Sequence, residues 1–235
     1  MDFDLLGCGD IGIIDVGSVG GLTEPWRSNS GVIKFLLNFE PNDSPVKGEH
    51  FVTYNTAVWE KDSILPFYIY KGFNATGSSL FKADFEYVKN NYEDLKNRGL
   101  KNLAETWFER AELVKTTQIL CRSLDNILQE SFNDQVFHFM KVDAQGAEYN
   151  ILKGASQFLS KNCVGLHLEL FVLPLYKDIV LMDEVMLFLN SFGFSLVKKF
   201  PAHGSFDSQH DCLFLKKDGD ANILRTIKNI YGISE

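Results

Sequence analysis

Short apolar runs bounded by turn residues recur along most of the chain, and patterns of helical period separate several of them. The first two runs predict strands at residues 11–16 and 32–39, the second of which is ended by Pro41. The further predicted strands are residues 50–59, 64–70, 116–123, 136–143, 163–171, 194–200 and 212–217. The predicted helices are residues 124–130, 147–161 and 182–193. This alternation predicts an α/β fold with a mostly parallel sheet and helices on both faces.

Residues 71–110 interrupt this regular alternation. They contain few core-forming runs, and a glycine- and serine-rich beginning is followed by a charged stretch. We therefore expect an insertion or cap at about 71–110 within one domain that spans residues 1–235. The aromatic side chains in and around it could stack on a sugar ring, but we expect them to pack the cap or a subunit interface; they are Phe73, Phe81, Phe85, Tyr87, Tyr92, Trp107 and Phe108.

The composition is that of an ordinary globular protein, with 45% hydrophobic and 23% charged residues. A net charge of −8 disfavours a general nucleic-acid binder. No apolar run approaches the ~20 residues of a membrane span, and the acidic start is not that of a signal peptide. Most of the cysteines lie in apolar strings that are typical of buried, reduced thiols. We expect a cytoplasmic protein without nucleic-acid or membrane partners, and a homo-oligomer remains possible.

Two glycine-rich segments could bind a cofactor. A literal GxGxxG at Gly7, Gly9 and Gly12 is a poor dinucleotide fingerprint, because only six residues precede it and a strand, not a helix, follows it. The turn in IIDVGSVGG, residues 13–21, follows the first strand, as ligand sites in open α/β sheets do. This second turn is therefore the better candidate.

Acidic residues at the ends of the first two strands indicate a cofactor that contains adenosine. Asp15 ends the first strand just before Gly17, where the backbone can pass close to a ligand. Glu40 ends the second strand, where it can accept hydrogen bonds from both ribose hydroxyls. A carboxylate repels a pyrophosphate but attracts the ammonium and sulfonium of S-adenosylmethionine. The charges therefore favour S-adenosylmethionine over NAD.

The most distinctive stretch is FMKVDAQGAEYNILKGA, residues 139–155. A strand ends in Lys141 and Asp143, which are two residues apart and therefore share one face. A turn at Gly146 then leads into a helix with Glu148 in its first turn. An ion pair or a helix cap explains Lys141 and Glu148 as well as a functional role does. Asp143, in contrast, lies where ligands bind in such sheets.

The order of these blocks resembles the FkbM-type family of S-adenosylmethionine-dependent methyltransferases. The blocks are DVGSVGG, NFEPN, NTAVW, GSSL, SLDNIL, KVDAQGAEYNILKGA, HLELF, LNSFGF and DCLFL, and they cover about residues 11–217. Where the family usually has Ala and then Asn or Arg in the glycine turn, this chain has Ser18 and Val19. The resemblance implies a Rossmann-like class I methyltransferase fold, with seven strands of which the last is antiparallel.

The resemblance also implies S-adenosylmethionine as the cofactor and places cofactor-binding residues at the ends of the first three strands. These residues are Asp15, Gly17, Glu40, Asn55 and Ala57. The first two would line the methionine part of the cofactor, the third would hold the ribose, and the last two would border the adenine. Asp143 would contact the cofactor and face the methyl-transfer centre.

Methyl transfer to a hydroxyl requires an acceptor held in line with the methyl group and benefits from a base. Asp143 and Glu169 are the candidate catalytic residues. For His167 we expect a hydrogen-bonded histidine within its strand. We expect no metal, and we expect acceptor contacts from residues 71–110 and 201–211. The function expected is O-methylation of a small-molecule or glycan hydroxyl. An NAD-dependent oxidoreductase and a non-catalytic binding module on the same fold remain alternatives.

Overall fold

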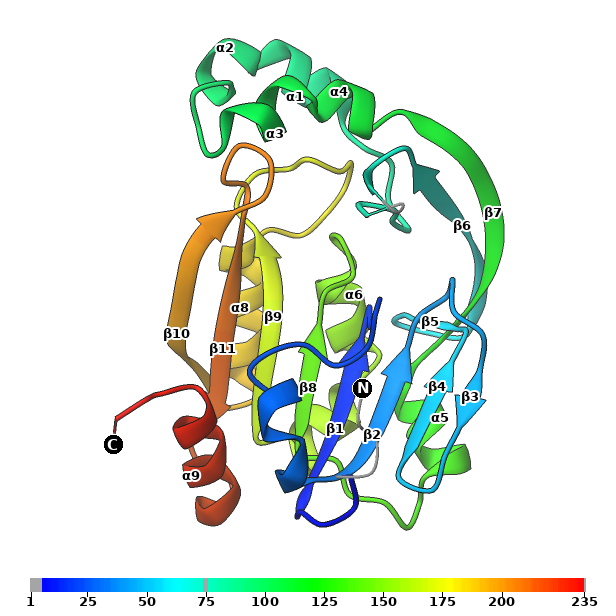
Figure 1. The fold of residues 1–235 in the computed structure, drawn as a ribbon, viewed down its shortest axis with the longest axis vertical. Helices are drawn as coiled ribbons and strands as arrows, with labels where there is room; N and C mark the ends of the chain where they lie inside the picture. Colours follow the sequence, from blue (N-terminus) through cyan, green and yellow to red (C-terminus); the bar gives the residue numbers. More distant parts are fainter. Residues whose placement is uncertain (1–5, 74–75, 235) are drawn as a thin grey trace.

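The computed structural model describes residues 6–73 and 76–234, and an eight-stranded mixed sheet forms its centre (Figure 1). In sheet order the strands are β10 (Phe194–His203), β11 (Gln209–Lys216), β9 (Gly165–Phe171), β8 (Phe139–Val142), β1 (Ile11–Val16), β2 (Ile33–Phe39), β4 (Phe51–Tyr54) and β3 (Val46–Lys47). The five strands from β9 to β4 pair in parallel, whereas β11 and β3 are antiparallel to their neighbours. The expected seven strands are therefore eight, because the short β3 adds to the edge of β4.

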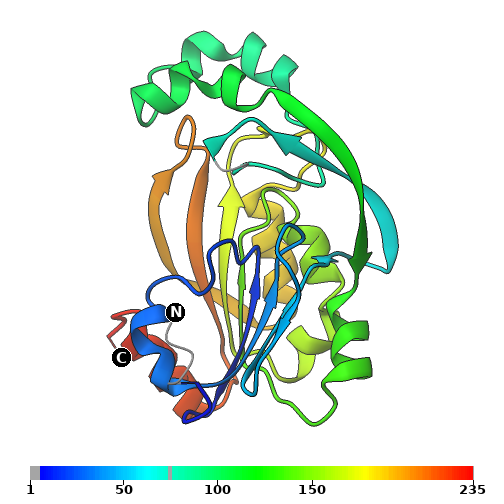
Figure 2. The same ribbon diagram turned by 45° about the vertical axis from the view of Figure 1, so that its right-hand side comes forward.

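A second sheet contains three strands, β5 (Ala57–Val58), β7 (Leu113–Arg122) and β6 (Ser63–Tyr70). The predicted strands at 64–70 and 116–123 exist, but they pair antiparallel with each other and do not join the main sheet. The predicted strand over 50–59 is likewise two strands, β4 and β5, in different sheets. Figure 2 shows β6 and β7 as a curved ribbon along one side of the molecule.

Residues 71–110 link β6 to β7, and their described part contains four short helices that we call the cap helices. They are α1 (Phe85–Asn90), α2 (Tyr92–Leu95), α3 (Lys101–Glu105) and α4 (Trp107–Arg110). The cap helices lie beyond the carboxyl ends of the central strands (Figures 1 and 2). Phe85, Tyr92, Trp107 and Phe108 make ring contacts with one another, and Trp107 also contacts Phe206. Most of these aromatic side chains therefore pack the cap.

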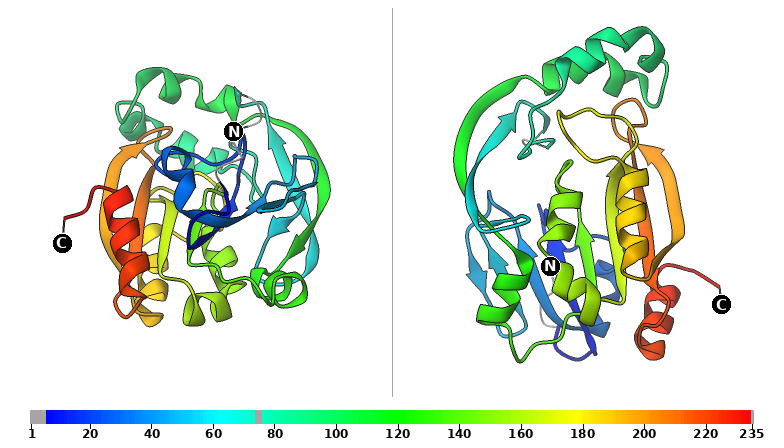
Figure 3. Two further views of the ribbon diagram at one scale, coloured as in Figure 1. Left: turned by 60° about the horizontal axis from the view of Figure 1, so that its bottom comes forward. Right: turned by 180° about the vertical axis from the view of Figure 1, so that it is seen from behind.

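Helices cover both faces of the main sheet (Figure 3). One face packs against α5 (Leu124–Ser131), α6 (Glu148–Lys153), α7 (Ser156–Lys161) and α8 (Met182–Ser191). On the other face lie the 3-10 helix η2 (Arg27–Val32) and α9 (Ala221–Ile230). Successive strand residues point to opposite faces, so Ile14 packs in the first core and Ile13 in the second. No helix in the described ranges is long and apolar enough to cross a membrane.

The predicted helix over 147–161 is interrupted between α6 and α7. At Gly154 the backbone passes so close to a neighbouring loop that a Cβ would lie 2.0 Å from the carbonyl oxygen of Trp59. The apolar stripe continues across this break, with Ile151 and Leu159 both buried. The sequence patterns did not predict α9, although its buried residues, Ile223 and Ile227, have helical spacing.

Candidate active site

A pocket of about 220 Å³ opens at the carboxyl ends of β1, β2 and β8. We call it the strand-end pocket. Its lining includes Gly17, Glu40, Ala57 and Asp143, four of the residues that the sequence predicted for the site. Asn55 is exposed and lies outside this lining. The GxGxxG glycines lie before and at the amino end of β1, away from the pocket.

Gly17 lets two strand ends approach each other closely. Its φ is +81°, and a Cβ at this position would lie 1.9 Å from the carbonyl oxygen of Asp143. The Gly17 amide also donates to the carbonyl oxygen of Phe39, at 2.9 Å. The glycine turn thus connects the ends of β8 and β2, which only a residue without a side chain permits.

Glu40 is a buried carboxyl group in the wall of the strand-end pocket. Its Oε1 accepts hydrogen bonds from the backbone amide of Asn42 at 2.9 Å and from its Nδ2 at 3.1 Å. Within the described part of the chain, Oε2 accepts none. Burial raises the pKa of Glu40 above its ordinary value, and the Asn42 hydrogen bonds oppose this. One oxygen is therefore fixed, and the other is available to a ligand.

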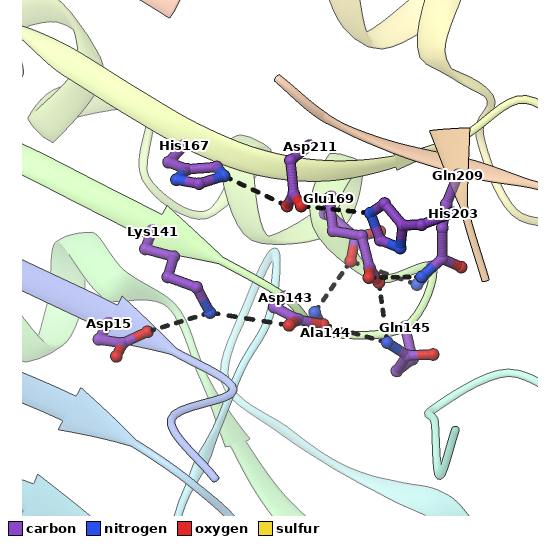
Figure 4. A network of polar contacts seen from close by, with 12 residues as sticks. Asp15, Lys141, Asp143, Ala144, Gln145, His167, Glu169, His203, Gln209 and Asp211 are labelled. Atoms are coloured by element: carbon purple, nitrogen blue, oxygen red, sulfur yellow. Dashed lines mark hydrogen bonds and ion pairs between the residues drawn. The ribbon is translucent and has the colours of Figure 1, made fainter. Parts of the chain in front are cut away.

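Lys141 lies between two carboxyl groups on the same face of the sheet (Figure 4). Its Nζ is 3.7 Å from Oδ1 of Asp15 and 3.7 Å from Oδ2 of Asp143. Asp15 is fully buried, and burial raises its pKa to about 6 although the charge of Lys141 lowers it. Asp15 does not line the pocket, whereas Lys141 and Asp143 do. Lys141 therefore forms the ion pair that was one of its two predicted roles.

Gln145 connects the two predicted catalytic carboxyl groups (Figure 4). Its Nε2 donates to Oδ1 of Asp143 at 3.0 Å and to Oε2 of Glu169 at 2.8 Å. The φ of Gln145 is +52°, a left-handed conformation that is uncommon for residues other than glycine and concentrates at functional sites. Gln145 was not among the predicted site residues, although it precedes Gly146 in the most distinctive stretch of the chain.

Glu169 is buried beneath this connection and lines neither the strand-end pocket nor the second pocket described below. It accepts hydrogen bonds from both Gln145 and Gln209. Burial, and then the negative charges of Asp143 and other nearby carboxyl groups, raise the pKa of Glu169 well above its ordinary value. Glu169 therefore favours the protonated form. Of the two predicted catalytic carboxyl groups, Asp143, whose side chain is 38% exposed, is the one that a ligand in the pocket can reach.

Glu148 holds the turn that carries Gln145. Its Oε1 accepts from the backbone amides of Ala144 at 2.9 Å and Gly146 at 3.3 Å. Burial raises the pKa of Glu148 to about 8. Both amides precede α6, so Glu148 stabilises the turn before the helix; the helix cap that was predicted as one role of Glu148 does not form, because α6 has no side-chain cap hydrogen bond in the described residues.

His167 and His203 contact one carboxylate beside this network. Their Nε2 atoms lie 3.2 Å from Oδ1 and 3.2 Å from Oδ2 of Asp211, respectively. Burial alone would raise the pKa of Asp211, but the two histidines hold it well below its ordinary value. His167 also pairs with the hydroxyl of Tyr231 at 2.9 Å, as expected of a hydrogen-bonded strand histidine. No group of three or more His, Cys, Asp or Glu side chains in the described ranges could hold a metal ion.

A second pocket, of about 210 Å³, lies under the cap helices, and we call it the cap pocket. The two pockets share Thr76, Gly77 and Gln145 in their linings. Residues from both predicted acceptor segments, 71–110 and 201–211, line the cap pocket. Gln145 thus lies where a ligand in one pocket would meet a ligand in the other.

The fold is that of an α/β protein with a pocket at the ends of its central parallel strands. The family model for the methyltransferase FkbM domain matches residues 27–196, which is well over half of the chain. The chain therefore belongs to the FkbM methyltransferase family. The match begins after Asp15 and Gly17, so these two residues lie outside it.

Among solved structures, the chain is similar to the crystal structure of a methyltransferase FkbM from Methylobacillus flagellatus KT, with 14% sequence identity and a TM-score of 0.47. The similarity covers 88% of this chain and 43% of that one, so this chain spans less than half the length of its relative. No curated protein matches the chain.

Proposed function

We propose that the protein is an S-adenosylmethionine-dependent O-methyltransferase that acts on a hydroxyl group of a small molecule or glycan. The observation that carries this proposal is the arrangement of Gly17, Glu40 and Asp143 around one pocket, at the ends of three adjacent parallel strands. Membership of the FkbM methyltransferase family supports the reaction class. The cofactor, the hydroxyl acceptor and the residue roles below are our inferences.

The residues of the strand-end pocket fit S-adenosylmethionine. Glu40 has one carboxylate oxygen available for ribose hydroxyls, and Gly17 lines the same pocket. Ala57 and Val58 give an apolar border for the adenine ring. The carboxyl group of Asp143, which lines the pocket, supplies negative charge for the ammonium and sulfonium groups.

S-adenosylmethionine supplies an electrophilic methyl group when it is bound. The task of the chain is to hold the acceptor hydroxyl and take its proton. Asp143 has the position for this role, because Gln145 binds its Oδ1 and Lys141 lies near its Oδ2. Glu169, which favours its protonated form, keeps Gln145 in place from the other side. An acceptor in the cap pocket would reach Asp143 past Gln145.

A transfer assay with methyl-labelled S-adenosylmethionine and a panel of sugars, polyols and hydroxy acids tests the proposal. We expect label on at least one acceptor with the wild type and much less with Asp143→Asn. Binding of S-adenosylhomocysteine without any transfer would instead support a non-catalytic module. Binding of NAD without S-adenosylhomocysteine would support the oxidoreductase.

A further inference from the structure

The cap pocket has aromatic walls and a single charged side chain. Tyr70, Trp107, Phe171 and Tyr176 contribute aromatic rings to its lining. Arg110, the last residue of α4, is the one charged residue in the lining that the structure describes. The other ionisable groups in that lining are the two tyrosine hydroxyls. Burial raises the pKa of both Tyr70 and Tyr176, so these hydroxyls stay neutral. The pocket therefore carries one positive charge.

Arg110 is fixed in place by neutral oxygen atoms. Its Nη2 donates to the carbonyl oxygen of Leu103 and to Oγ of Ser205, both at 2.7 Å, and its Nε donates to Oγ1 of Thr106 at 3.0 Å. In the described part of the chain, no carboxylate forms an ion pair with Arg110, and its Nη1 donates to no acceptor. A partly buried guanidinium that is positioned but has no counter-anion is suited to an anionic ligand.

Glu169, which is hydrogen-bonded to two residues of the lining, does not supply this counter-anion. Glu169 reaches the pocket only through the amides of Gln145 and Gln209, and its raised pKa favours the neutral acid. Arg110 is contributed by the cap helices, whereas Gln145 is shared with the strand-end pocket. A ligand that contacts both residues would have its anion at Arg110 and could present a hydroxyl near Gln145 and Asp143.

We propose that the cap pocket binds the methyl acceptor and that this acceptor carries a carboxylate or phosphate group, which pairs with Arg110. The aromatic walls would contact the body of the acceptor, either a sugar ring or an aromatic ring. This inference rests on the proposed function and narrows the acceptor to a hydroxylated acid or phosphate.

Matched pairs of ligands test this proposal by calorimetry, with and without S-adenosylhomocysteine. The pairs are glucuronate and glucose, glucose 6-phosphate and glucose, and 4-hydroxybenzoate and 4-hydroxybenzyl alcohol. We expect at least one anion to bind 10-fold or more tightly than its neutral counterpart, because a charge-assisted pair contributes more than a neutral one. The carboxylate and phosphate arms distinguish the two kinds of anion.

Arg110→Ala should remove this preference, with a loss of about 10- to 100-fold in affinity for the anion. Arg110→Lys, which keeps the charge, should retain part of it. Arg98→Ala is the matched control, because Arg98 is an exposed cation between α2 and α3 and lines neither pocket. It should bind the anion as the wild type does. A thermal melt of each variant verifies that it is folded.

Three results would overturn the inference: no anion binds, each anion binds no better than its neutral counterpart, or folded Arg110→Ala keeps the preference. If S-adenosylhomocysteine still binds in those experiments, the proposed function stands while the acceptor assignment fails. If S-adenosylhomocysteine does not bind to the folded wild type, the proposed function itself fails.

Discussion

Replacement of Glu40 by glutamine tests whether Glu40 binds the ribose of the cofactor or only ends a strand. The amide oxygen of Glu40→Gln can still accept both hydrogen bonds from Asn42, so the local turn is retained. The other oxygen, which accepts no hydrogen bond in the described residues, becomes an NH₂ group that cannot accept one from a ribose hydroxyl. Only the interaction with the ligand should therefore change.

The size of the effect follows from the loss of a hydrogen bond to a charged acceptor. Such a bond contributes about 1.5–3 kcal/mol, so the dissociation constant for S-adenosylhomocysteine should rise about 10- to 150-fold. The free energy of unfolding should stay the same or increase, because burial raises the pKa of Glu40 and thus disfavours its ionised form. The variant should lose affinity without losing stability.

Isothermal titration calorimetry with S-adenosylhomocysteine measures the affinity, and urea denaturation measures the stability. Asp43→Asn is the matched control, since it removes an exposed carboxylate three residues away that does not line the pocket. We expect its dissociation constant to stay within about twofold of the wild-type value, because isolated surface charges contribute little. Equal affinities of Glu40→Gln and the wild type would refute the ribose assignment.

Three further predictions concern the strand ends around the pocket. Gly17→Ala should lower the free energy of unfolding, measured in urea, by about 2–5 kcal/mol, because the new Cβ would clash with the Asp143 carbonyl and φ is positive. Gly20→Ala is the control: φ is also positive there but the space is open, so the loss should be only about 1–2 kcal/mol. Equal losses in the two variants would contradict the clash. Asp143→Asn should slow single turnover at saturating cofactor about 10²- to 10⁴-fold, and an unchanged rate would end its assignment as the base. Burial raises the pKa of Glu148 from 4.5 to about 8, so the folded state binds the extra proton and wild-type stability should fall as pH rises through this range. Glu148→Gln should weaken that fall between pH 5 and pH 8 in urea titrations, and an unaltered pH dependence would show that Glu148 is not its source.

The central strands could be predicted from the sequence because they are buried on both faces. β1 and β9 are buried at every position, so their apolar runs are continuous and end at recognisable turns. Gly17, Glu40 and Asp143 follow the ends of β1, β2 and β8, and they line one pocket at the carboxyl ends of these strands. For these strands, the apolar pattern of the sequence directly reflects burial in the centre of the sheet.

The second sheet could not be predicted, because strand pairing depends on contacts between distant residues. β6 and β7 pair across the whole cap segment, and their apolar patterns are also compatible with an edge of the main sheet. The break at Gly154 has the same origin, since the backbone of Trp59 approaches it from another part of the chain.

Gln145 and Arg110, which line the cap pocket, could not be recognised as candidate site residues from the sequence alone. Gln145 is important because it connects Asp143 to Glu169, which lies on another strand. Arg110 belongs to a charged helical stretch in which nothing distinguishes it from a solvated surface residue. Its position in the cap pocket depends in part on a hydrogen bond to Ser205, in the loop between β10 and β11. Such roles are defined by three-dimensional contacts and leave no local signal.

We propose above that the strand-end pocket binds S-adenosylmethionine. The most direct test of this proposal is a calorimetric titration of the folded wild-type protein with S-adenosylhomocysteine and, separately, with NAD. We predict saturable binding of one S-adenosylhomocysteine per chain and no binding of NAD. Binding of NAD, with no heat from S-adenosylhomocysteine, would contradict this account.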